Sequence, residues 1–142
     1  MDEHQPVDDS EFIYRRIPLI YFDAGLDIPV TREAFRPTEK DTTGLSVFRS
    51  GIAKPSDALA TLDQEKAKKY YVAGLPASEV RKLGLTVIPN PIPGGPPGHA
   101  VIPEINWNSY QARKDRWKPI LFALAKLASA NIVHRPGSRG GG

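Results

Sequence analysis

The sequence predicts an α+β fold, in which a small and mostly antiparallel sheet is covered by helices. The chain has 142 residues, of which 40% are hydrophobic and 25% are charged, a composition typical of one globular domain. It carries 14 prolines and short, irregularly spaced β-branched runs, which argues against the regular strand–helix–strand spacing of a doubly wound parallel sheet. We expect one domain at 11–133, a disordered acidic tail at 1–10 and a flexible Gly/Arg tail at 134–142.

Five segments have the composition of β-strands. Aromatic and β-branched residues fit a pleated, half-buried surface, and they concentrate in residues 12–22, 45–49, 70–73, 85–88 and 99–105. Pro18 cannot donate a ladder hydrogen bond, so the first of these segments is predicted to be an edge strand or a bent one. The segment at 70–73 has a second interpretation, as the frayed end of the helix before it.

Three segments are predicted to be helical, at 56–68, 76–83 and 109–131. Ser56 or Thr61 could cap the first. The second has proline at its start, bases in its last turn and Gly84 as a left-handed C-cap, the clearest local signal in the chain. Pro119 is expected to split the third into a basic first part and an apolar second part.

His99 is the sharpest single candidate for catalysis, at the start of the last predicted strand and beside a Pro/Gly-rich inter-strand loop. An imidazole can act as a general base near neutral pH. Glu104 is the acid closest to it in sequence, but a separation of five places the two side chains on opposite faces of an unbroken strand. The interpretation we favour is a partly buried, hydrogen-bonded structural histidine.

The loop itself contains Gly94, Gly95 and Gly98 between prolines. Its backbone N–H groups could bind an anion, or the loop could present a polyproline-type ligand to an aromatic groove. The sequence matches neither common phosphate-loop pattern, and we favour a stiff connection between two strands.

Arg49 is the third catalytic candidate, because guanidinium groups suit phosphates and carboxylates. Together with Arg32 and Arg36 it could converge on such a group, although surface arginines are the default interpretation.

The segment from Tyr110 to Lys118 combines bases with aromatic residues, a pattern that can bind nucleic acid. Its candidate binding residues are Tyr110, Arg113, Lys114, Arg116 and Trp117. Tyr110 and Trp117 are seven apart and share one helix face, so we favour two core aromatics below a solvated basic face.

Several classes of site and location are excluded or disfavoured by composition. The chain has no cysteine and three scattered histidines, which excludes thiol chemistry and leaves no metal-ligand spacing. We expect no cofactor. No apolar run reaches the ~18 residues of a membrane span, and the acidic N-terminus is unlike a signal peptide. We therefore expect a cytoplasmic protein.

The leading hypothesis is a binding or interaction module without a catalytic constellation, because no complete set of catalytic residues is visible. Residues 119–130 are apolar nearly all round and predict a protein partner or a homodimer. One alternative is nucleic-acid binding through 110–118 and the C-terminal tail. Another is a small enzyme that uses His99 on a phosphate-containing substrate.

Overall fold

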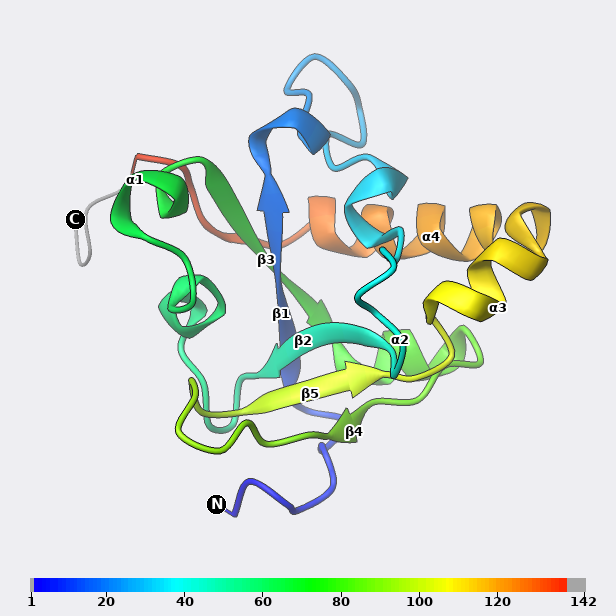
Figure 1. Ribbon diagram of the computed structural model, residues 1–142. Coiled ribbons are helices and arrows are strands. Elements are labelled where there is room, and N and C mark those ends of the chain that lie inside the picture. Colours follow the sequence, from blue (N-terminus) through cyan, green and yellow to red (C-terminus); the bar gives the residue numbers. More distant parts are fainter. Residues whose placement is uncertain (1, 138–142) are drawn as a thin grey trace.

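The computed structural model describes residues 2–137, and it confirms the α+β class (Figure 1). One antiparallel sheet has the strand order β4-β5-β2-β1-β3-β6. Its strands are β1 (Phe12–Pro18), β2 (Leu45–Arg49), β3 (Tyr70–Pro76), β4 (Ile88–Pro89), β5 (His99–Ile102) and β6 (Ile132–His134). The α-helices are α1 (Gln64–Ala67), α2 (Ala77–Lys82), α3 (Trp107–Ala112) and α4 (Lys114–Ser129). Three 3-10 helices are η1 (Leu19–Tyr21), η2 (Arg32–Phe35) and η3 (Pro55–Leu59).

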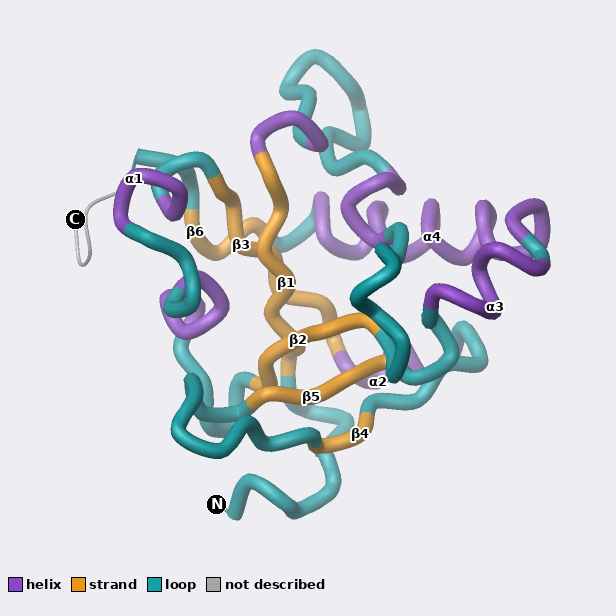
Figure 2. Tube along the Cα trace, in the orientation of Figure 1, coloured by secondary structure: helices purple, strands orange, loops and turns teal. Residues whose placement is uncertain are grey.

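The main core lies between the sheet and α4, which packs against β3 and η2. Alternation along β1 sends Ile13 and Ile17 into this core, where both side chains are fully buried. α4 contributes a stripe of buried residues at helical spacing, Leu121, Leu124, Ala125 and Ala128. A smaller cluster forms under η3, so both faces of the central strands are covered (Figure 2).

The sheet is divided into two halves that diverge in the middle. β1 pairs with β3 along its whole length, from Phe12↔Pro76 to Pro18↔Tyr70. It pairs with β2 at only two positions, Ile13↔Arg49 and Tyr14↔Phe48. In Figure 1, β1 and β2 accordingly cross at a steep angle. The space where they separate holds the site described below.

Residues 12–22 were predicted to be an edge strand or a bent one. The edge position is wrong, because β1 lies between β2 and β3, but the strand does end at Pro18, where the chain turns into η1. Pro18 is the last residue of β1, where the missing N–H interrupts no later ladder bond. Residues 70–76 form a strand and not the end of a helix.

Two of the three predicted helices begin and end elsewhere. Residues 56–68 are divided between η3 and α1, because Asp63 caps a new helix by accepting from the backbone N–H of Lys66 at 2.7 Å. In the last region the break falls at Arg113, and α4 continues through Pro119. The prediction for 76–83 is confirmed by α2, which is followed by Gly84 at φ +84°.

The last two predicted strands are shorter than expected. β4 contains only Ile88 and Pro89, and β5 ends before Pro103, since proline cannot extend a ladder. The strands pair with each other at Ile88↔Val101 and Pro89↔Ala100, and residues 90–98 connect them. β6 was not predicted.

The chain ends differ from the expected tails. Residues 2–10 lie against the body of the protein, and Val7 is only 3% exposed. This segment is held by the buried Val7 side chain and by backbone carbonyls that accept hydrogen bonds from Arg49 and Arg81. His134 belongs to β6 and pairs with Val72, while positions 138–142 of the expected C-terminal tail lie outside the described residues.

Candidate functional site

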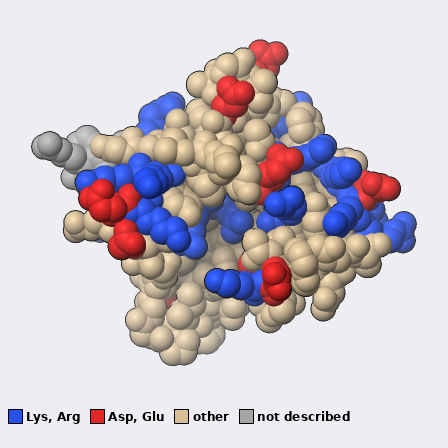
Figure 3. Space-filling view, turned by 45° about the horizontal axis from the view of Figure 1, so that its top comes forward, with Lys and Arg blue, Asp and Glu red and all other residues tan. Residues whose placement is uncertain are grey.

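A cleft of about 450 Å³ opens where β1 and β2 separate. Its walls come from both strands, from β5, from the 3-10 helices and from residues 33–41. Figure 3 shows Lys and Arg side chains on both sides of a hollow in this face. The charged residues that line the cleft are Arg15, Arg16, Glu33, Arg36, Lys40 and Asp41.

Arg15 occupies the point where the β1–β2 ladder stops. The next hydrogen-bonded pair in that register would join Arg16 and Ser46, but the strands have already diverged there. The carbonyl of Ser46 instead accepts a hydrogen bond from Nη1 of Arg15 at 2.9 Å. Nε and Nη2 of Arg15 donate to the carbonyl of Ala34 at 3.2 and 3.1 Å. The guanidinium thus replaces part of the missing ladder and joins β2 to η2.

The charge of Arg15 is desolvated, and Asp41 of the same cleft lies close enough to act on it. Burial lowers the pKa of Arg15 to about 10, and the charge of Asp41 opposes that shift. The group therefore stays cationic at neutral pH. No ion pair of Arg15 is found among residues 2–137. Asp41 offsets this desolvation only in part, because the pKa of Arg15 stays below its ordinary value, so the adjoining space favours an anion.

The other cations of the cleft are more exposed. Arg16 donates to Oγ1 of Thr61 at 3.0 Å and lies over the ring of Tyr70. Arg36 follows η2 and is solvent-exposed, as is Lys40.

Both acids of the cleft are already engaged by neighbours. Glu33 faces Arg32 at 3.7 Å, and Asp41 accepts from the backbone N–H of Thr38 at 2.7 Å. Neither carboxylate forms an ion pair with a cation of the cleft within the described chain.

His99 lines the cleft and is 7% exposed. Its Nδ1 is 2.7 Å from the carbonyl of Asn90, and its Nε2 is 3.1 Å from Oγ of Ser46. A carbonyl can only accept, so Nδ1 carries a proton, and in the neutral imidazole Nε2 then accepts from the serine hydroxyl. The edge of the Phe48 ring meets the imidazole at a centroid distance of 5.3 Å. The ring is thus fixed in one tautomer, facing Ser46.

Aromatic side chains give the cleft an apolar component. Tyr14, Tyr21, Phe48 and Tyr70 contribute to its lining. Burial raises the pKa of Tyr14 above its ordinary value, so this phenol is neutral at physiological pH. The site combines ring surfaces with guanidinium groups.

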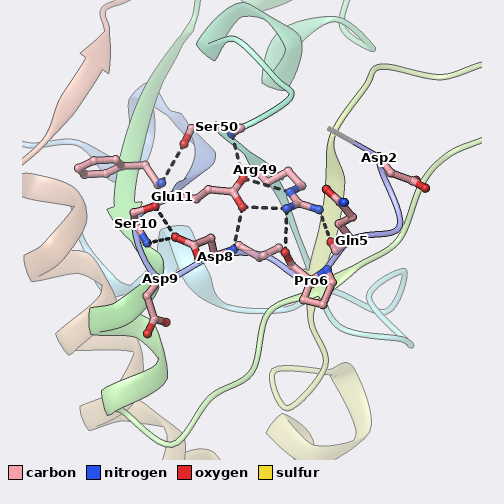
Figure 4. A network of polar contacts seen from close by, with 12 residues as sticks. Asp2, Gln5, Pro6, Asp8, Asp9, Ser10, Glu11, Arg49 and Ser50 are labelled. Carbon is pink, nitrogen blue, oxygen red and sulfur yellow. Dashed lines mark hydrogen bonds and ion pairs between the residues drawn. The ribbon is translucent and has the colours of Figure 1, made fainter.

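Arg49 does not reach the cleft, so its assignment as a catalytic candidate is corrected. It is fully buried and forms a bidentate ion pair with Glu11 (Figure 4). The distances are 3.1 Å from Nε to Oε1 and 2.8 Å from Nη2 to Oε2. Its guanidinium also donates to the carbonyls of Gln5 and Pro6. Arg49 therefore anchors the N-terminal segment.

Glu104 does not meet His99 either. Its two oxygens accept from the backbone N–H and the hydroxyl of Thr86, at 2.9 and 2.6 Å. This carboxylate ties the segment before β4 to the turn after β5, a structural role that explains an acid at that position.

The glycines of the inter-strand loop do not gather around the cleft. Gly98 adopts φ +79° and its N–H donates to Oε1 of Glu3 at 3.2 Å. The N–H of Gly95 donates to the carbonyl of Ile92, and Gly94 lies in a turn with φ +71°. Of the loop between β4 and β5, Ile92 is the residue that lines the cleft.

The basic segment of the C-terminal region also lies apart from the cleft lining. Tyr110 is 8% exposed and belongs to the core, and Trp117 packs against that core while its Nε1 donates to the carbonyl of Ser109. Arg113, Lys114 and Arg116 are exposed. The two aromatics are engaged in packing and leave these bases without an exposed ring from the same segment.

Sequence reasoning singled out His99 but missed Ser46 and Arg15. One signal was present: Arg15 stands between Ile13 and Ile17 at a core-facing position of an alternating strand. A charged residue at a core-facing position interrupts the apolar pattern, and such an interruption indicates a specific structural or functional role.

The described part of the chain holds neither a metal-ligand cluster nor a membrane-spanning helix. No group of three or more potential metal-ligating side chains is present in residues 2–137. No helix in that range is both long and apolar enough to cross a membrane.

Comparison with family models, with curated proteins and with solved structures finds no match to this chain.

Proposed function

We propose that this protein is a binding module whose cleft takes a small, phosphate-containing ligand. The observation that carries the proposal is Arg15, a desolvated guanidinium that lines the cleft and donates three hydrogen bonds to neutral carbonyls. No carboxylate of residues 2–137 lies at ion-pair distance from it, and Asp41 compensates its charge only in part. A bound anion would supply the missing counter-charge.

The charge of the lining fits a doubly charged anion. Four cationic side chains and two carboxylates line the cleft, a formal excess of two positive charges. A phosphate monoester carries about −1.5 to −2 near pH 7. Guanidinium groups bind such oxygens with paired hydrogen bonds, so phosphate is favoured over a single carboxylate.

The size and the apolar walls indicate a ligand larger than a bare phosphate. The volume of about 450 Å³ lies within the range of roughly 300–1,000 Å³ that is common for small-molecule sites. The aromatic residues of the lining offer ring surfaces to an organic part of the ligand. A phosphorylated organic molecule would use both components.

The test is calorimetric titration of the full chain with inorganic pyrophosphate. Arg36 is the variant of choice because it is exposed and no internal contact of its side chain is present in the described structure. Arg36→Gln should weaken pyrophosphate binding by about tenfold, since hydrogen bonds to charged groups contribute about 1.5–3 kcal/mol.

The matched control is Arg116→Gln, which makes the same change at an exposed position outside the cleft. It should bind pyrophosphate like the natural protein, and binding of both should weaken as salt is added. Equal losses in the two variants, or no binding by the natural protein, would contradict the proposal.

A further inference from the structure

The strongest chemical feature of the cleft is a chain of hydrogen bonds that ends on a hydroxyl. It runs from the Asn90 carbonyl through the imidazole of His99 to Oγ of Ser46. Both ends of the ring are fixed at short distances, 2.7 Å at Nδ1 and 3.1 Å at Nε2. Ser46 is only partly buried and lines the cleft, so the hydroxyl adjoins the space that a ligand would occupy.

This is the arrangement that activates a nucleophile. A serine hydroxyl is weakly nucleophilic by itself and becomes reactive when an adjacent base takes its proton. The base must present an unprotonated nitrogen to the hydroxyl, and a third group must hold it in that tautomer. In this protein the Asn90 carbonyl does so by accepting the Nδ1 proton.

We propose that Ser46 is a nucleophile that attacks the phosphorus of a phosphoric ester or anhydride bound in the cleft, with His99 as its general base. This inference rests on the proposed function, because it takes the phosphate group of that ligand as the electrophile. It adds phosphoryl-group hydrolysis to binding.

Arg15 is placed to assist such a step. Its Nη1 is hydrogen-bonded to the carbonyl of Ser46 itself, so the guanidinium is held beside the residue that attacks. A fixed positive charge at this place stabilises the negative charge that develops on the phosphoryl oxygens during the reaction. Arg15 also keeps its position without the ligand, because two backbone carbonyls hold it.

The step balances with water as the only co-reactant. Oγ of Ser46 forms a bond to phosphorus while its proton passes to Nε2 of His99. The bond from phosphorus to the leaving oxygen breaks, and that oxygen departs with the electron pair and takes the proton from Nε2. Water then attacks phosphorus, passes a proton to Nε2 and displaces Oγ, which recovers that proton. The products are phosphate and the released alcohol or second phosphate.

The test is covalent labelling of the full chain with diisopropyl fluorophosphate, whose electrophilic phosphorus needs no knowledge of the natural ligand. Attack by Oγ forms the Oγ–P bond and releases fluoride. Intact mass and peptide mapping should show one adduct, located on Ser46. Ser46→Ala should abolish it, and His99→Gln should slow it by about 100-fold, since a positioned general base contributes roughly 10²–10⁴.

Ser56→Ala is the matched control, an exposed serine in η3 that should leave the labelling rate unchanged. Pyrophosphate titration of Ser46→Ala and His99→Gln shows whether their clefts are intact. If no Ser46 adduct forms in the natural protein, or if His99→Gln labels at the natural rate while it still binds pyrophosphate, the inference is overturned.

The two proposals fail in different ways. Absent labelling with intact pyrophosphate binding removes the nucleophile and leaves the binding function standing. Labelling at Ser46 with no pyrophosphate binding removes the phosphate ligand and leaves an activated serine whose substrate is of another class.

Discussion

Arg15 and Arg49 show how one residue type takes two roles in neighbouring strands. Each stands at an inward position of an alternating pattern, between or after buried aliphatic residues. Arg49 meets the carboxylate of Glu11, whereas Arg15 meets carbonyls alone. Arg49 and Glu11 form an ion pair within the protein, whereas the charge of Arg15 beside the cleft is compensated only in part, by Asp41. The identity of the partner, which the sequence does not display, distinguishes the arginine of a structural ion pair from the arginine that lines the cleft.

Glu11→Gln should destabilise the protein by about 3–5 kcal/mol near pH 7, because it removes the carboxylate that pairs with the buried Arg49 guanidinium. Burial by itself would raise the pKa of Glu11, but hydrogen bonds from Arg49 and from the backbone N–H groups of Asp8 and Gly51 lower it below 4.5. Folding therefore lowers this pKa, so the stabilisation is complete above the unfolded-state value and is lost as the pH falls below it.

Urea unfolding over a series of pH values measures this effect. The difference between the natural protein and Glu11→Gln should narrow as the solution becomes more acidic. Glu79→Gln is the control, since its contact with Lys82 is at the surface and should contribute less than about 1 kcal/mol. A difference that stays constant into acid would contradict the assigned sign.

At the scale of elements, α4 has a proline within its hydrogen-bonded interior. Pro119 is the sixth residue of this helix, so the carbonyl of Asp115 lacks its usual N–H partner. Pro119→Ala should restore that bond and stabilise the protein by about 1–3 kcal/mol. Thermal unfolding followed by circular dichroism would show a higher midpoint. Lys118→Ala, one position earlier and exposed, should change stability by under ~0.5 kcal/mol. A lower midpoint for Pro119→Ala would show that the proline favours the packing of this helix.

The elements that could be predicted from the sequence are those whose determining residues lie within one short segment. α2 and Gly84 followed from residues within one short segment. Three other results depend on partners distant in sequence: the interior place of β1, the unpredicted β6, and the retention of Ile88 alone from the predicted strand 85–88. His99 could be singled out because its surroundings in the chain are unusual. Its partner Ser46 is 53 residues away, and only the β2–β5 register brings the two together.

At the scale of the whole molecule, the N-terminal segment belongs to the folded unit. Val7 is buried in the main core, its carbonyl accepts from Arg81 at 2.5 Å, and Glu3 reaches Gly98. Val7→Ala should cost about 1.5–2 kcal/mol, since two buried methyl groups are removed. Urea midpoints would measure the loss against Val133→Ala, whose side chain is 40% exposed and should show little change. If Val7→Ala were as stable as the natural protein, the result would support the expectation that residues 1–10 are disordered.

The separation of β1 from β2 has a consequence for how selective the cleft can be. Part of its lining comes from strands of the sheet, and Arg15 is held by the backbone carbonyls of Ser46 and Ala34. Such a surface is preorganised, so little conformational entropy is lost when it is occupied. Discrimination would then come from how well a molecule matches a fixed arrangement of charges and rings. A site of this kind tolerates few shapes and binds the matching one without rearrangement.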